Sequence, residues 1–191
     1  WENNIGRSLS FCEAVFPKIK ELFPVQMKSV TTTEFYRAVN GVRNSATRLD
    51  ADELAYALHV LIRYEIEKLI FDGSISVDKL PEEWNRLYKQ YLGIDVPDHA
   101  HGVLSDAHWS GGAFGYFPCY ALGTAYAAQI FEVLQKAVDL EGCAANKDFT
   151  PARQWLTEKI YRFGKLYTPD KLIWETCGEA FNPDYYTAYL K

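Results

Sequence analysis

Residues 52–71 limit most strongly the kind of fold that this chain can adopt. Apolar side chains recur there at intervals of three and four residues, namely Leu54, Leu58, Leu61, Ile62, Ile66, Leu69 and Ile70. This spacing gathers them on one broad stripe of an α-helix. Asp50 or Asp52 can cap the start of such a helix, and Gly73 can end it. The sequence therefore predicts a long amphipathic helix that runs to about Phe71.

The rest of the chain repeats this combination of apolar spacing and helix-ending residues. Helices are predicted from Ser8 or Ser10 to Leu22, over 35–39, from Pro81 to Gly93, from Tyr120 to Leu140 with Gly142 as its end, from Thr150 to Gly164, and in two short segments that open at Pro169 and Pro183. Residues 74–77 can add a short extended piece, but no run of β-branched residues has period two. The prediction is an all-α fold in which residues 1–191 form a single domain.

Charge and composition narrow the classes of function. The chain has a formal net charge of −5, so the clustered Lys and Arg of a nucleic-acid-binding protein are not expected. No apolar run approaches the roughly 18–20 residues of a membrane span, and the first residues do not resemble a signal peptide. The four cysteines are widely separated and include no C-x-x-C pair. They predict reduced thiols in a cytoplasmic protein.

Residues 102–123, GVLSDAHWSGGAFGYFPCYALG, concentrate the groups that can do chemistry. The stretch contains five glycines, which let the backbone approach a ligand closely. His108 and Tyr116 lie on either side of residues 110–112, so both can point at one place and donate hydrogen bonds to a developing oxyanion. The alternative is structural: His108 and Asp106 tie the loop together while its aromatic residues anchor it to the core.

A second group of charged residues lies at 47–53. Arg48 is either one half of a surface ion pair, worth ~0.5 kcal/mol, or an anchor that binds a carboxylate at two points. On the predicted long helix, His59, Arg63 and Glu67 share a face because they are four residues apart. That face is either a buried polar network or a solvated side, and we favour a structural role.

The chain shows no complete metal-binding motif of its own. Its histidines are His59, His99, His101 and His108; they form no H-E-x-x-H and have no cysteine partners at zinc spacing. The nucleophile motif G-x-S-x-G is also missing. A metal site built from this chain alone is therefore not expected.

Two long motifs resemble those of one enzyme family. TRLDADELAYALHVLIRYEIEK is similar to the I-R-x-x-A-D motif, and the helix after it, of the thermostable, Taq-type metallocarboxypeptidases. The second resemblance is to that family's signature G-x-L-Q-D-x-H-W-S-x-G-x-F-G-Y-F-P-S/T-Y. It is carried, in the same order, by WN, YLGIDVPD and then GVLSDAHWSGGAFGYFPCYALG. The resemblance runs the full length of the chain. Departures at Thr47, Ser105, Ala107 and Cys119 affect the expected substrate preference but not the assignment.

The resemblance implies an all-helical, cleft-bearing, cytoplasmic metallopeptidase that forms a homodimer and removes single residues from peptide C-termini. In that family zinc or cobalt is held by the two histidines of H-E-x-x-H and by a later glutamate, in a segment that ends in W-E-N. Because this chain starts at Trp1-Glu2-Asn3 and has its only methionine at Met27, we expect it to be the C-terminal part of a longer protein. The metal ligands and the general-base glutamate are expected upstream, and the isolated chain is expected to be inactive.

The resemblance also implies roles for individual residues. Arg48 matches the arginine that engages the terminal carboxylate of the substrate, and Asp106 is assigned to the same substrate-binding set. His108, Tyr116 and, more weakly, Tyr120 match donors for the tetrahedral intermediate. The expected partners are peptide C-termini, with no nucleic acid and no membrane. The alternative, from a different class, is a non-catalytic helical module that binds peptide ends or a partner subunit.

Overall fold

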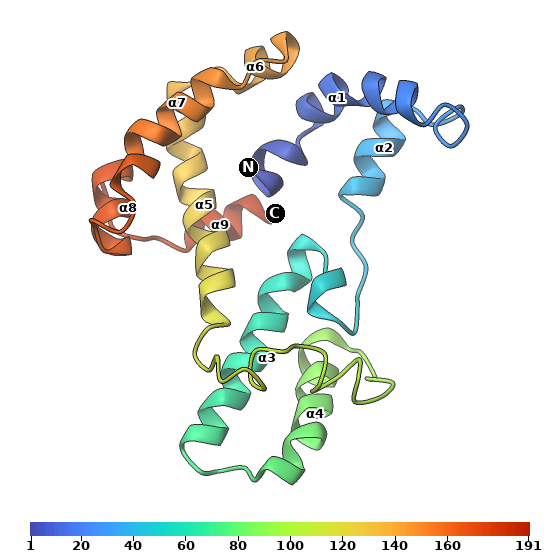
Figure 1. Cartoon of the computed structure of the whole chain (residues 1–191), viewed down its shortest axis with the longest axis vertical. Helices are drawn as coiled ribbons and strands as arrows, with labels where there is room; N and C mark the ends of the chain where they lie inside the picture. The colour runs from blue at the N-terminus through green and yellow to red at the C-terminus, as the bar shows by residue number, and fades with distance from the viewer. The chain divides into compact units, whose positions relative to one another are not determined.

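The computed structural model describes residues 1–191, and all its regular elements are helical (Figure 1). The α-helices are α1 (Leu9–Leu22), α2 (Thr32–Val39), α3 (Glu53–Phe71), α4 (Leu80–Leu92), α5 (Pro118–Ala137), α6 (Leu140–Asn146), α7 (Thr150–Lys159), α8 (Pro169–Cys177) and α9 (Asp184–Tyr189). Short 3-10 or π turns are η1 (Glu2–Gly6), η2 (Arg48–Asp50), η3 (Val77–Lys79) and η4 (Tyr161–Phe163). The all-α prediction is confirmed. None of the helices combines the length and apolarity needed to cross a bilayer.

The chain forms two compact units. Residues 1–41 and 124–191 make up the first unit, and residues 42–123 make up the second. The chain therefore passes between the units twice, and the second boundary, after residue 123, falls within α5. All the predicted site residues belong to the second unit. The organisation of residues 1–191 as a single domain stays a prediction.

Local sequence signals explain where the helices of the second unit begin and end. The carboxylate of Asp52 caps α3 by accepting hydrogen bonds from the backbone N–H groups of Leu54 and Ala55, at 2.9 and 3.0 Å. α4 carries Pro81 in its first turn and ends at Gly93, whose φ of 70° is a left-handed conformation that favours glycine. The predicted boundaries of both helices are confirmed.

The core of the second unit lies between α3 and α4, which run side by side (Figure 1). Ile62 and Ile66 of α3 belong to one buried cluster with Trp84 and Tyr88 of α4. The rings of Trp84 and Tyr88 stack on each other with their centroids 5.1 Å apart. Trp109, from the segment after α4, packs edge-on against Trp84 at 6.0 Å. Burial of each large apolar side chain contributes about 1.5–3 kcal/mol, so this core holds the segment that contains the candidate site against both helices.

In the first unit, side chains cap the starts of the first two helices, and Ser8 is one of the two starting residues predicted for α1. The hydroxyl of Ser8 accepts a hydrogen bond from Phe11 N at 3.2 Å and caps α1. Thr31 and Glu34 form a capping box at the start of α2, in which each side chain bonds to the backbone of the other. Both caps thus arise from short-range sequence signals.

Three of the predicted elements are wrong. The helix predicted from Thr150 to Gly164 ends at Lys159, because Ile160 leaves the helical backbone conformation (φ −125°, ψ −64°), and the separate 3-10 turn η4 follows. The single helix predicted from Tyr120 to Leu140 is divided, because the carboxylate of Asp139 accepts a hydrogen bond from Gly142 N at 2.9 Å and caps a new helix, α6. Gly142 therefore lies inside α6 and does not end α5, which stops at Ala137. Residues 74–77 form no extended strand but lead through a bend into η3.

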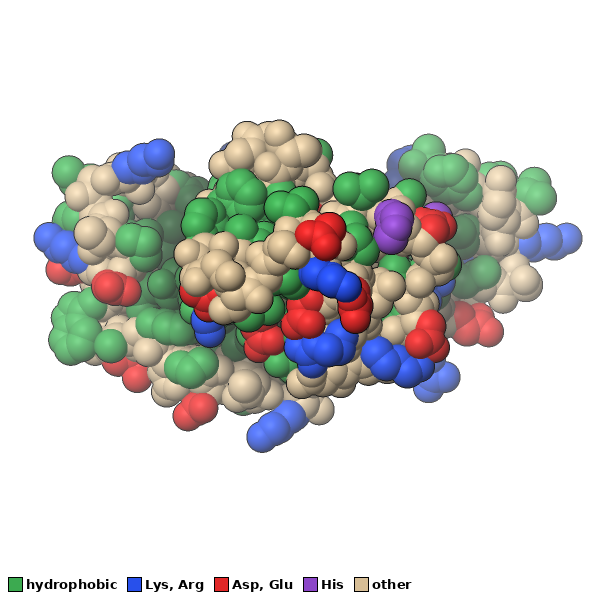
Figure 2. Space-filling model, turned by 90° about the horizontal axis from the view of Figure 1, so that it is seen from below, with side chains coloured by type: hydrophobic (Ala, Val, Ile, Leu, Met, Phe, Trp, Pro, Cys, Tyr) green, Lys and Arg blue, Asp and Glu red, His purple; other side chains and the backbone are tan.

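Figure 2 shows one face of the molecule, with charged and hydrophobic side chains mixed together. On that face Lys and Arg side chains alternate with Asp and Glu, and neither sign gathers into a large patch. In the second unit, several large apolar side chains are exposed, among them Leu54, Tyr64, Phe71, Leu104 and Phe114.

Candidate active site

The carboxylate of Asp106 lies between two arginines that come from distant parts of the second unit. Its Oδ1 accepts a hydrogen bond from Arg48 Nη2 at 2.7 Å, while its Oδ2 accepts one from Arg63 Nε at 2.7 Å and lies 2.6 Å from Arg63 Nη2. The side chains of Arg48 and Arg63 are 7% and 0% exposed. The interpretation of Arg48 as half of a surface ion pair is therefore wrong, and the pair is buried.

The charge of Asp106 is maintained by these two contacts. Burial acts to raise the pKa of the Asp106 carboxyl, but the hydrogen bonds and positive charges of Arg48 and Arg63 outweigh it and lower that pKa below its ordinary value. Both carboxylate oxygens are occupied by arginine. Asp106 is thus an ionised bridge between two cations, and it makes its contacts with the protein itself.

The guanidinium of Arg48 is held on several sides. Its Nη1 donates to Tyr56 Oη at 3.1 Å, and its Cζ lies 4.8 Å from the ring centre of Tyr120 and 5.7 Å from that of Phe117. Stacking on aromatic rings fixes the plane of a guanidinium. The bonds to Tyr56 and Asp106 use two of the five N–H donors of Arg48, and its buried Nε has no hydrogen-bond partner. One donor of Arg48, the buried Nε, is therefore unpaired in the folded chain.

His108 lies next to this ion group. Its Nε2 is 3.1 Å from Tyr120 Oη, and its Nδ1 is 3.8 Å from Asp106 Oδ1, which is too long for a hydrogen bond. The His108 ring packs against Phe117 at 4.5 Å and against Tyr116 at 5.7 Å between centroids. The structure thus brings His108, Tyr116, Tyr120 and Asp106 together, and Tyr116 is the most open of them at 50% exposure.

Beneath the ion group, one face of α3 carries a polar stripe formed by Tyr56, His59, Arg63 and Glu67. His59, Arg63 and Glu67 are buried. Arg63 Nη1 donates to the backbone oxygen of His59 at 2.7 Å and to Tyr88 Oη at 3.1 Å, and Tyr88 Oη also lies 3.0 Å from His59 Nδ1. Of the two interpretations of this face, the buried polar network is the one that the structure confirms.

His59 is expected to remain neutral well below pH 7. Burial, followed by the positive charges of Arg63 and Arg48, lowers the pKa of His59 from 6.5 to about 4. Between these values the unfolded chain binds a proton that the folded chain does not, so His59 makes the free energy of unfolding fall as the pH decreases through this window. We expect NMR of the His59 ring to show the neutral form at pH 5, with the denatured chain as reference. A midpoint near 6.5 in the folded protein would contradict this prediction.

Comparison with known proteins decides the family. The family model for the Carboxypeptidase Taq (M32) metallopeptidases matches residues 1–191. This chain belongs to the M32 metallopeptidase family. Carboxypeptidase 1 of Bacillus subtilis (strain 168) is 45% identical to this M32 chain over 191 residues, and Thermostable carboxypeptidase 1 of Thermus thermophilus is 41% identical over 192 residues. Both matches cover all of this chain and 38% of the relative, so the chain spans little more than a third of their length.

Solved M32 structures share the fold. The crystal structure of BsuCP superposes with a TM-score of 0.94 at 45% identity, covering 100% of this chain and 38% of that one. The M32 carboxypeptidase from Deinococcus radiodurans R1 gives a TM-score of 0.95 at 41% identity, covering 100% and 39%. The family and the helical fold expected from the two motifs are confirmed. The roles of Arg48, Asp106, His108, Tyr116 and Tyr120 stay predictions.

An M32 metallopeptidase implies a divalent metal, but the side chains of this chain do not fit one. Residues 1–191 contain no group of three or more His, Cys, Asp and Glu side chains that could hold a metal ion. His99 and His101 are exposed, and His101 Nδ1 lies 2.9 Å from a carboxylate oxygen of Asp98. The contact between His101 and Asp98 therefore lies on the surface.

Sequence reasoning missed some of the residues that complete the candidate site. Tyr56 and Phe117, which hold the Arg48 guanidinium, were not among the predicted site residues, and neither was Arg63. A signal for Arg63 existed in its i,i+4 spacing from His59 and Glu67. That spacing identifies a shared face, but it does not reveal which segment the face contacts.

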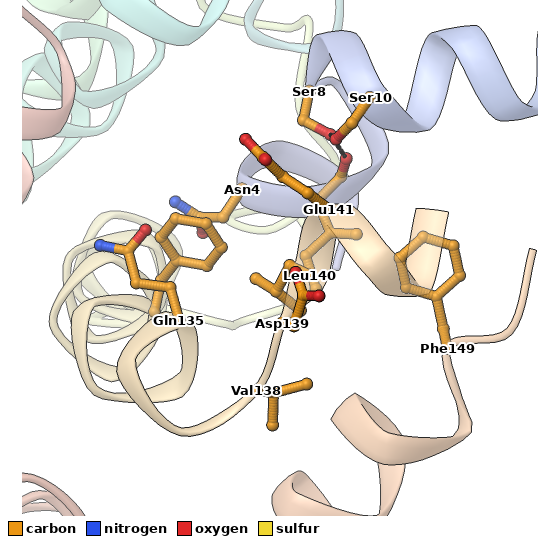
Figure 3. Close-up of a pocket in the computed structure, with 11 residues that line it drawn as sticks. Asn4, Ser8, Ser10, Gln135, Val138, Asp139, Leu140, Glu141 and Phe149 are labelled. Carbon is orange, nitrogen blue, oxygen red and sulfur yellow. Dashed lines mark hydrogen bonds between the residues drawn. The ribbon is translucent and has the colours of Figure 1, made fainter. Parts of the chain in front are cut away.

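A separate cavity of about 370 Å³ lies in the first unit (Figure 3). Its walls come from η1, the start of α1, the end of α5, α6 and the segment before α7; they are formed by Asn4, Ile5, Ser8, Ser10, Phe131, Gln135, Val138, Asp139, Leu140, Glu141 and Phe149. In Figure 3 the hydroxyls of Ser8 and Ser10 are joined by a dashed line, at 3.3 Å. None of the predicted site residues lines this cavity, so it is not part of the candidate site of the M32 chain.

Proposed function

We propose that the protein containing this chain is a metal-dependent carboxypeptidase that hydrolyses single residues from peptide C-termini. Residues of the second unit would bind the terminal carboxylate and the carbonyl oxygen under attack. The activity is supported by the family and by the names of the relatives. The observation that carries the roles of this chain is the gathering of Arg48, His108 and Tyr120 around one ionised carboxylate, Asp106.

Arg48 is the group that we assign to the terminal carboxylate of the substrate. Its guanidinium stacks on the rings of Tyr120 and Phe117, and its buried Nε has no hydrogen-bond partner. A guanidinium can bind a carboxylate through two parallel hydrogen bonds, which favours a free C-terminus over a neutral amide.

His108, Tyr116 and Tyr120 are the groups that we assign to the oxyanion of the tetrahedral intermediate. Their rings lie within 6 Å of one another in centroid distance: His108 to Tyr116 5.7 Å, His108 to Tyr120 5.9 Å, and Tyr116 to Tyr120 5.4 Å. Imidazole and phenol groups can donate hydrogen bonds to an oxygen on which negative charge develops. The partial exposure of Tyr116 leaves its hydroxyl accessible to a ligand.

We assign the metal, zinc or cobalt, and the general base to parts of the protein outside this chain, since residues 1–191 provide no fitting ligand group. The contributions assigned to this chain are therefore substrate binding and hydrogen-bond donation. A cytoplasmic location and a homodimer are part of the same proposal.

Arg48→Lys in the full-length protein tests the carboxylate anchor. Lysine keeps the charge beside Asp106 but loses the planar pair of donors, so kcat/KM for peptides with a free C-terminus should fall about 10–100-fold, as expected for the loss of a hydrogen bond to a charged group. C-terminally amidated peptides should remain equally poor substrates of both proteins. The measurement is steady-state hydrolysis of matched free and amidated peptides.

The matched control is Arg43→Lys, an exposed arginine five residues earlier in the chain. It should behave as the unmodified protein on both peptides. If Arg48→Lys keeps full activity on free C-termini, the anchor role is wrong. If the full-length protein cleaves neither peptide, the non-catalytic peptide-binding module becomes the better interpretation.

A further inference from the structure

One carboxylate of α3 binds both ends of a turn in the candidate site. Glu67 Oε1 accepts a hydrogen bond from Trp109 Nε1 at 2.7 Å, and Glu67 Oε2 accepts one from the backbone N–H of Gly115 at 3.0 Å. Glu67 is only 5% exposed. Both of its oxygens are thus engaged by the segment from Trp109 to Gly115, which we call the glycine turn.

The ends of the glycine turn are the neighbours of two proposed donors. Trp109 directly follows His108, and Gly115 directly precedes Tyr116. Within the turn, Ala113 N donates to the backbone oxygen of His108 at 2.8 Å, so the chain folds back on itself. Gly115 has a φ of 72°, a left-handed conformation that other residues rarely adopt. Glu67 therefore fixes the two points between which the backbone reverses, one residue away from each donor.

Aromatic packing holds the glycine turn against α3 but does not fix its register. Phe114 packs edge-on against Phe71, one helical turn after Glu67, at 5.3 Å, and it stacks with Trp109 at 6.4 Å. These contacts are apolar and tolerate small shifts, whereas hydrogen bonds to a charged carboxylate are directional and roughly twice as strong as neutral ones. The backbone N–H of Gly115 donates to Glu67, a side chain from outside the glycine turn.

We propose that Glu67 is a positioning residue: it fixes the glycine turn so that His108 and Tyr116 present their donors to one point. Glu67 acts through the turn and does not contact the substrate. This inference rests on the oxyanion role proposed for His108 and Tyr116. Donors fixed before the reaction need no reorganisation as charge develops, and a displacement of about 1 Å can lower a rate by as much as ~10²-fold.

Glu67→Gln in the full-length protein tests the inference. Glutamine has the same shape, but an NH2 group replaces one of the two oxygens, so either Trp109 Nε1 or Gly115 N loses the acceptor that it now has. We expect kcat, normalised to the folded fraction, to fall about 10–100-fold with KM changed less than about twofold. We also expect faster hydrogen exchange in residues 109–116, because the Gly115 N–H loses its acceptor in part of the population.

The matched control is Glu65→Gln on the same helix. The Glu65 carboxylate accepts a hydrogen bond from Tyr91 Oη of α4 at 2.8 Å, a contact outside the glycine turn. This variant removes the same charge as Glu67→Gln. Because Glu65 does not bind the glycine turn, kcat and the hydrogen exchange of residues 109–116 should stay unchanged. Equal effects of the two substitutions would overturn the positioning role.

The outcome for His108→Ala separates this inference from the proposed function. If His108→Ala lowers kcat and Glu67→Gln does not, the positioning role is wrong while the oxyanion role stands. If neither substitution lowers kcat, both are wrong. A lower melting temperature of Glu67→Gln with an unchanged normalised kcat shows a purely structural role and also overturns the inference. A fall in kcat with faster exchange, seen only for Glu67→Gln and not for Glu65→Gln, supports it.

Discussion

Replacement of Asp106 by asparagine is expected to lower the free energy of unfolding of the full-length protein by about 3–5 kcal/mol. The amide has the shape of the carboxylate but not its charge. Arg48 and Arg63, 7% and 0% exposed, would then remain buried without the anion that both now bind. The cost of a buried unpaired charge makes this effect larger than that of an ordinary surface substitution.

The same variant should change how stability depends on pH. Although burial alone would raise the pKa of Asp106, Arg48 and Arg63 lower it below the ordinary carboxyl value. A group with a lowered folded pKa stabilises the protein fully above its unfolded pKa of about 4 and loses that contribution as the pH falls through the folded pKa. The difference in stability between the unmodified protein and Asp106→Asn should therefore be largest near pH 7 and should narrow below about pH 4.

Urea denaturation at several pH values measures both effects. Asp98→Asn is the control, because the Asp98 carboxylate is exposed and pairs with His101 on the surface. Screening by water makes such surface pairs weak, so that variant should change stability only slightly. The buried bridge is not supported if Asp106→Asn is as stable as Asp98→Asn at pH 7.

The helices could be predicted from the sequence because their ends depend on local chemistry. Asp52 before α3 and Gly93 after α4 give the same signal in the sequence as in the structure. The division between α5 and α6 was missed because Gly142 suggested a stop, whereas Asp139, three residues earlier, caps a new helix. A helix end at Gly142 and a helix cap at Asp139 are both consistent with the local sequence, and only the backbone geometry decides between them.

The candidate site was predictable only in part, for a different reason. The chemistry of residues 47–53 and 102–123 singled out Arg48, Asp106 and His108, and the resemblance of both segments to family motifs assigned them roles. Arg63, which binds Asp106, lies 43 residues before it in the chain. Glu67, which binds Trp109 of the glycine turn, lies 42 residues before Trp109. A charged i,i+4 stripe has the same sequence pattern whether water or another segment covers it, so its role depends on tertiary packing.

The second large effect is expected for His108→Ala, with a decrease in kcat of about 10²–10³-fold and a smaller change in KM. The proposed role of the imidazole is to donate a hydrogen bond to an oxygen whose negative charge is greater in the transition state than in the substrate. Removal of such a donor therefore affects the chemical step more than binding. Steady-state kinetics of the full-length protein measures the two parameters separately.

A second substitution distinguishes this role from packing, because alanine also removes the contact of the His108 ring with Phe117 at 4.5 Å. His108→Gln keeps most of the volume and can place an amide N–H near the present position of Nε2, which lies 3.1 Å from Tyr120 Oη. If hydrogen-bond donation from Nε2 is what matters, glutamine should restore part of the activity that alanine loses. If glutamine restores stability but not kcat, hydrogen-bond donation from the position of Nε2 does not account for the activity that alanine loses. An unchanged kcat in both variants contradicts the oxyanion role, since it leaves the His108 ring with packing alone.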